Sequence, residues 1–188
     1  MSHHVYTTRG IVLYLRPARE ADRVAVILTG DLGLVHGIAR GARKPTSKLS
    51  NSLLEFALVR VSLVRGRHSW RITTVTLVRD VYGELRGRKA AVEALGRVLA
   101  LTGKLVSGEE KHQELFDSLE RAIILLVDDV GDEDEDAWEL LTVARVLNSL
   151  GYLSGESLPA NLLETREKRR VLLELVNRGI RSSGLYNV

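Results

Sequence analysis

The spacing of apolar residues changes once along this chain, close to Gly83. Up to about Asp80, β-branched residues are dense, apolar side chains alternate with their neighbours, and the runs break at turn residues, which is typical of short strands. After Gly83, apolar residues recur every three or four positions, which is the period of a helix that buries one face. We therefore predict an α+β protein with an all-β domain over residues 1–80 and an all-α domain over residues 81–188.

The first part contains five apolar runs that suit strands. They lie around residues 11–15 and over 23–29, 34–39, 53–64 and 70–78. A hairpin signal, Gly30-Asp31-Leu32-Gly33, joins the second run to the third. Five short strands without an intervening helix suit a small closed barrel better than a sandwich, which usually needs about seven strands. We predict a five-stranded OB-fold barrel.

The second part contains four amphipathic segments with short connections, which predict a helical domain. The first covers about residues 92–105 and the third ends at Gly151. The second helix is expected to start at Ser107, with Glu110 as its capping-box partner. The third is expected to start in the acidic residues 132–136. The fourth is expected to follow Pro159, with Asn161 and Glu164 as its cap pair.

The net charge of +3 hides an uneven distribution. Residues 1–80 carry thirteen Lys and Arg against five Asp and Glu, whereas residues 81–188 carry fourteen against nineteen. The first part therefore has a charge of +8 and the second a charge of −5, which suggests that the first part meets a polyanion. The acidic run 128–136 is explained by the favourable position of carboxylates at a helix start.

A basic loop, residues 38–48, is the main candidate for that contact. Four of the nine residues from Arg40 to Lys48 are cations, and Gly41 and Pro45 lie among them. The loop is therefore expected to project into solvent, where it is either a phosphate contact or only a solvated turn. The guanidinium groups of Arg65 and Arg67, at a predicted hairpin tip, can hold phosphate bidentately. The predicted DNA-binding residues are Arg40, Arg43, Lys44, Lys48, Arg65, Arg67 and Arg71.

The sequence shows no pattern for catalysis, a cofactor or a metal. The five histidines lack metal-ligand spacing, and neither a nucleophile elbow nor a phosphate-binding loop with lysine is present, so we predict a protein that is not an enzyme. Two aromatic residues, Trp70 and Tyr14, could stack on bases or belong to the core. The absence of cysteine, of a secretory start and of a long apolar run predicts a cytoplasmic protein without membrane contact.

A succession of short motifs runs through residues 9–56. The motifs are Gly10-Ile11-Val12-Leu13, Arg16-Pro17, Glu20-Ala21-Asp22-Arg23, Leu28-Thr29, Gly33-Leu34-Val35, Ala39-Arg40-Gly41-Ala42-Arg43-Lys44 and Leu53-Leu54-Glu55-Phe56, followed by Gly66. Their order and spacing resemble the N-terminal domain of the RecO family of DNA repair and recombination mediators. A weaker similarity continues through residues 114–119 and 147–152.

This resemblance implies an OB-fold followed by a helical domain, binding of single- and double-stranded DNA, and annealing of complementary strands. It also implies work with RecR and single-strand-binding protein to load RecA on gapped DNA in the RecF pathway. Many family members carry a cysteine zinc module in the helical domain, but this chain has no cysteine, so we expect a helical domain without that module. The alternatives are a protein-interaction adaptor and an RNA-binding OB module.

Overall fold

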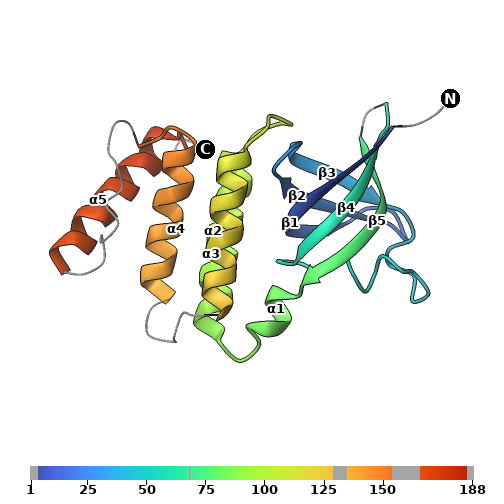
Figure 1. The fold of residues 1–188 in the computed structure, drawn as a ribbon, viewed down its shortest axis with the longest axis horizontal. Coiled ribbons are helices and arrows are strands. Elements are labelled where there is room, and N and C mark those ends of the chain that lie inside the picture. Colours follow the sequence, from blue (N-terminus) through green and yellow to red (C-terminus); the bar gives the residue numbers. More distant parts are fainter. Residues whose placement is uncertain (1–3, 68, 129–134, 154–165, 186–188) are drawn as a thin grey trace.

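The computed structural model describes residues 4–67, 69–128, 135–153 and 166–185, with a ring of strands at one end and a row of helices at the other (Figure 1). Helix α1 lies beside the end of the last strand (Figure 1). The elements are β1 (Val5–Pro17), β2 (Arg23–Thr29), β3 (Gly33–Ala39), β4 (Leu58–Arg65), β5 (Trp70–Arg79), α1 (Val81–Glu84), α2 (Lys89–Leu105), α3 (Gln113–Asp128), α4 (Glu135–Ser149) and α5 (Arg166–Ser182).

The five strands close into a ring in the order β1-β2-β3-β5-β4. Strand β1 is long enough to pair with two neighbours, since its first half lies against β4 and its second half against β2. All neighbours are antiparallel except β3 and β5, which pair in parallel over a short stretch. The prediction of an α+β chain, with a five-stranded OB-fold-like part followed by helices, is confirmed.

The middle of β1, residues 10–13, and most of β2, residues 25–29, are buried on both faces. One set of their side chains, including Val12 and Ile27, packs inside the ring. The alternate set, including Ile11, Leu13 and Leu28, is also buried because it packs in one cluster with residues of α2 and α3. The ring and the helices therefore share apolar contacts, and the proposed division into domains at residue 80 remains a prediction.

The fourth strand begins later than the sequence predicts. We expected a strand over residues 53–64, but β4 starts at Leu58 and residues 53–57 belong to the preceding connection. The reason is local, because the backbone of Phe56 has a φ of +63°, which a strand does not accept. Phe56 donates its N–H to the carbonyl of Val12 at 2.9 Å, and the N–H of Val12 is donated to the carbonyl of Ala57 at 3.0 Å.

The predicted start of the second long helix was wrong. It begins at Gln113 rather than at Ser107, because the intervening segment packs against the ring: the N–H of Leu34 donates to the carbonyl of Gly108 at 3.1 Å. Gly108 has a φ of +78°, which a residue in a right-handed helix does not adopt, so a helix that starts at Ser107 is excluded. The short helix α1 was not foreseen, and the predicted cap pair Asn161 and Glu164 lies outside the described residues.

The helices pack on one another through buried side chains. Trp138 on α4 is buried, and its indole N–H donates to the backbone carbonyl of Ala122 on α3 at 2.7 Å. On α5, Leu172 and Val176 are buried. None of the helices in the described ranges is long and apolar enough to cross a lipid bilayer.

Candidate nucleic-acid interface

The basic loop is fixed at its base to the turn between β1 and β2. Gly41, with a φ of +65°, donates its N–H to the carboxylate of Asp22 at 2.8 Å, and Arg43 donates its N–H to the carbonyl of Ala21 at 2.9 Å. Ala42, which lies between Gly41 and Arg43 in the chain, is fully buried. The backbone of the loop is therefore held in place while its charged side chains are presented outward.

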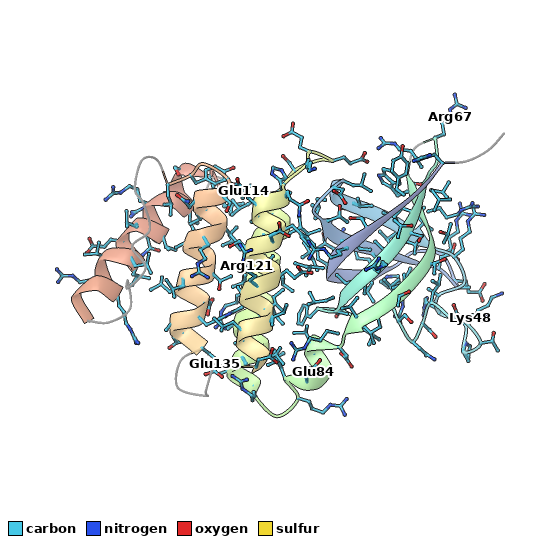
Figure 2. All side chains as sticks on the ribbon, in the orientation of Figure 1. Lys48, Arg67, Glu84, Glu114, Arg121 and Glu135 are labelled. Atoms are coloured by element: carbon cyan, nitrogen blue, oxygen red, sulfur yellow. The ribbon has the colours of Figure 1, made fainter. Side chains whose placement is uncertain are left out.

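All four cations of the basic loop are exposed. Arg40, Arg43, Lys44 and Lys48 make no ion pair with any residue that the structure describes. Lys48 lies on the side of the ring away from the helices, and Arg67 projects at another corner of that same end (Figure 2). Their full charge is consequently available to an anionic partner.

Arg40 shares a groove with three other predicted DNA-binding residues, which we call the arginine groove. The parallel pairing of β3 with β5 places Ile38 beside Arg71, and so brings the start of the basic loop next to the start of β5. The hairpin between β4 and β5 adds its two arginines to the same place. The groove has a volume of about 340 Å³ and its cationic lining is Arg40, Arg65, Arg67 and Arg71.

Arg65 differs from the other arginines of this groove because it is already paired. Its guanidinium contacts the carboxylate of Glu109 and lies 4.9 Å from the centre of the Trp70 ring. The indole N–H of Trp70 donates to the same carboxylate at 2.9 Å, and Trp70 is buried. Trp70 therefore belongs to the core, and Glu109 offsets part of the charge of the groove.

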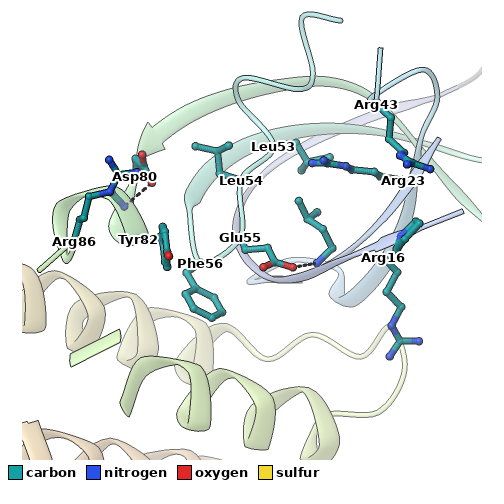
Figure 3. Close-up of a pocket in the computed structure, with 13 residues that line it drawn as sticks. Arg16, Arg23, Arg43, Leu53, Leu54, Glu55, Phe56, Asp80, Tyr82 and Arg86 are labelled. Atoms are coloured by element: carbon teal, nitrogen blue, oxygen red, sulfur yellow. Dashed lines mark hydrogen bonds between the residues drawn. The ribbon is translucent and has the colours of Figure 1, made fainter. Parts of the chain in front are cut away.

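Arg43 lines a second groove, which we call the α1 groove, between the ring and the short helix (Figure 3). It has a volume of about 630 Å³ and contains three arginines that sequence analysis did not select as contacts: Arg16, Arg23 and Arg86. Two of them, Arg16 and Arg23, lie within the motifs that carried the family resemblance, which was the available signal. Lys44 and Lys48 line neither groove.

Tyr14, the second aromatic residue considered for base stacking, is half-buried and already covered. The guanidinium of Arg16 lies 4.7 Å from the centre of its ring and donates to its hydroxyl at 3.1 Å. Arg16 therefore contacts Tyr14 and also lines the α1 groove.

Two arginines of the ring, Arg9 and Arg79, are neutralised by carboxylates of the helices. Arg9 contacts Asp117 and Glu120 on α3. Arg79, at the end of β5, is held by carboxylates from α1 and α3, Glu84 at 2.8 Å and Asp128 at 2.5 Å. The hydrogen bond that Arg79 donates to Asp128, followed by the one it donates to Glu84, raises the pKa of the Arg79 guanidinium. The free positive charge therefore gathers on the loop and the two grooves.

An exposed array of cations of this kind is chemically suited to contact an extended polyanion. Exposed arginines and lysines contact phosphates without reading base sequence. Within the described ranges, no group of three or more histidine and carboxylate side chains is placed to hold a metal ion.

Comparison with known proteins shows similarity to one family. Residues 1–81 match the family model described as Recombination protein O N terminal. A protein named DNA repair protein RecO from Dehalococcoides mccartyi is 45% identical over 73 residues, which are 39% of this chain and 28% of that protein. A protein of the same name from Anaeromyxobacter dehalogenans is 33% identical over 112 residues, which are 58% of this chain and 44% of that protein. Another, from Symbiobacterium thermophilum, is 27% identical over 150 residues, which are 79% of this chain and 57% of that protein. The matched segment thus spans between about a quarter and little more than half of these curated relatives.

Proposed function

Since residues 1–81 match the family model described as Recombination protein O N terminal, we propose that this chain is a DNA repair protein of the RecO family that binds single- and double-stranded DNA and anneals complementary strands. The observation that carries the proposal is the set of cations on the basic loop, which make no ion pair with any described residue, together with the arginines that line the two grooves beside it. Arg40 lines one groove and Arg43 the other, so one loop serves both surfaces.

The proposed mechanism is electrostatic and needs no covalent step. Cations that neutralise phosphates release condensed counterions and so stabilise the complex. When two strands are held on one positive surface, the repulsion between them falls and pairing of complementary bases becomes faster. Contacts to phosphate carry no base information, so binding is expected to tolerate any sequence.

The cellular role proposed here follows from the family and is mediation rather than catalysis. We propose that the protein works in the cytoplasm with RecR and single-strand-binding protein, and that it assists the loading of RecA on gapped DNA in the RecF pathway. The DNA contacts are assigned to Arg40, Arg43, Lys44 and Lys48, with Arg67 and Arg71 from the arginine groove. Arg65 contributes less, because Glu109 neutralises it.

Strand annealing tests the proposal directly. The rate of pairing of two complementary fluorescent oligonucleotides is measured with wild type, with an Arg40→Ala, Arg43→Ala, Lys44→Ala variant, and with a matched control. The control, Lys104→Ala, Arg121→Ala, Arg178→Ala, removes the same charge from exposed positions on the helices. We expect wild type and the control to accelerate annealing and the loop variant to lose that acceleration.

Two other outcomes separate the alternatives. A wild-type protein that binds neither DNA nor RNA near physiological salt contradicts the proposal and favours a protein-interaction adaptor. Binding that prefers an RNA strand over a DNA strand of the same sequence requires recognition of the 2′-hydroxyl, and favours an RNA-binding module.

A further inference from the structure

We propose that the α1 groove is a binding site for single-stranded DNA in which Tyr82 stacks on an unpaired base while the arginines of the groove hold the neighbouring phosphates. This inference rests on the proposed DNA binding and adds a contact that distinguishes a single strand from a duplex. The groove is lined from the ends of β1 and β2, the segment before β4, and α1 (Figure 3).

Tyr82 is an aromatic side chain placed where a base can reach it. It lies on α1 and has an exposed fraction of 49%, whereas most large apolar side chains of the ring are buried. Asp80 caps α1 by accepting the N–H of Gly83 at 2.9 Å, which fixes the helix that carries Tyr82. An exposed ring on a fixed backbone is the kind of platform on which bases stack.

Phe56 supports Tyr82 from inside the molecule. The two ring centres are 6.3 Å apart with a tilt of 60°, and they lie next to each other at one end of the groove (Figure 3). Phe56 is half-buried and packs against the cluster formed with the helices. Its φ of +63° is unfavourable for a non-glycine residue and is maintained by the hydrogen bonds to Val12. The backbone thus accepts strain at the residue that backs the exposed ring.

The charge of the groove also fits a DNA strand. Four arginines face two carboxylates, which leaves a formal charge of +2. Both carboxylates are engaged with backbone groups: Glu55 accepts the N–H of Leu15 at 2.9 Å, and Asp80 caps α1. Arg16, Arg23 and Arg43 lie at the opposite end of the groove from Tyr82 (Figure 3), so a strand that meets both ends presents phosphates to one and a base to the other.

A duplex cannot use this contact, because its bases are stacked and paired, whereas a single strand can turn a base outward. The arrangement therefore predicts that Tyr82 contributes to single-strand affinity alone. The arginines of the groove, by contrast, contribute wherever a phosphate backbone is bound.

Abasic DNA separates the two contributions. Fluorescence anisotropy is used to compare an oligo-dT strand, an abasic strand of the same length and charge, and a duplex. We expect wild type to bind oligo-dT more tightly than the abasic strand. Tyr82→Ala is expected to weaken oligo-dT binding about tenfold and to leave the abasic strand and the duplex within about twofold, since one stacking contact is lost.

Two further variants complete the test. Tyr82→Phe keeps the ring and should bind oligo-dT as wild type does, with unfolding midpoints measured for both variants to show that they fold. Arg86→Gln should weaken oligo-dT and the abasic strand to a similar extent, because it removes a phosphate contact.

The results distinguish failure of this inference from failure of the proposed function. If folded Tyr82→Ala binds oligo-dT as wild type does, or loses oligo-dT and the abasic strand equally, the base contact is overturned while DNA binding stands. If wild type binds none of the three DNA probes, both the base contact and the proposed function are overturned.

Discussion

Arg40 and Arg43 are three residues apart in the basic loop, yet they line different grooves on the ring of strands. Arg40 faces the start of β5, whereas Arg43 faces β1, β2 and α1. The backbone between them is fixed by Asp22 and Ala21, so the two guanidinium groups are held on separate surfaces. Under the proposed function, these two cationic surfaces, joined by one loop, would allow two strands to be held at once.

Removal of the loop charges should change the salt dependence of DNA binding. The Arg40→Ala, Arg43→Ala, Lys44→Ala variant is expected to flatten the plot of log affinity against log salt by about two units on single strands, at about 0.7 per phosphate contact. The measurement is a titration of a fluorescent oligonucleotide at several salt concentrations. An unchanged slope in the folded variant contradicts the assignment of these residues, and the helix variant described above should keep the wild-type slope.

Release of Arg65 from its partner should strengthen DNA binding. Glu109→Gln removes the carboxylate charge but keeps an oxygen that can accept the N–H of Trp70, so the packing around the indole is preserved. The guanidinium of Arg65 then becomes available to a phosphate. We expect single-strand affinity at low salt to rise by a few fold and the salt slope to steepen by about 0.7. Unchanged affinity and slope in this variant contradict a phosphate contact at Arg65.

Gly33 should be among the positions of the ring least tolerant of a side chain. It has a φ of +66°, and a Cβ atom there lies 2.2 Å from the backbone oxygen of Glu110, which cannot move without detaching the segment before α3. Gly33→Ala is expected to lower the free energy of unfolding by more than about 3 kcal/mol, since backbone strain alone costs about 1–3 kcal/mol. Denaturant titration measures the change.

Gly108 provides a matched comparison for Gly33. It has a φ of +78° and no atom within 4 Å of an added Cβ, so Gly108→Ala tests the backbone strain without the collision. It should destabilise the protein by only about 1–2 kcal/mol. Equal losses in the two variants would show that the contact between Gly33 and the segment before α3 is not tight.

The ion pair between Arg79 and Asp128 should stabilise the fold in a pH-dependent manner. The hydrogen bond from Arg79 lowers the pKa of Asp128 below its ordinary value of 3.8, so the folded state binds this proton more weakly than the unfolded state does. The stabilisation is therefore present above about pH 4 and is lost as the pH falls through the folded-state pKa. Asp128→Asn removes it.

The pH dependence is measured by urea unfolding of wild type and Asp128→Asn between pH 5 and pH 2. The difference in unfolding free energy between the two proteins should shrink as the pH falls. Asp117, whose pKa is lowered mainly by its hydrogen bond with Gln113, titrates in both proteins and cancels in the comparison. A difference that stays constant over this range contradicts the prediction.

Sequence reasoning was accurate where structure depends on neighbours along the chain. The change in apolar spacing near Gly83 separated strands from helices, and the hairpin from Gly30 to Gly33 lies between β2 and β3 as predicted. It was wrong where a distant contact competes with a local signal. Ser107 and Glu110 form a plausible capping box, but the segment that holds them packs on β3, and the helix starts six residues later.

The sequence by itself determined the α+β class, the five strands and an exposed basic loop, because burial period, turn residues and charge density are local properties. Only the tertiary structure decided which cations share a groove. Closure of the ring places Arg40 beside Arg71, and the position of α1 brings Arg86 into the groove of Arg43. It also decided that Trp70 is buried and that Glu109 neutralises Arg65, since these contacts join residues that are far apart in the chain.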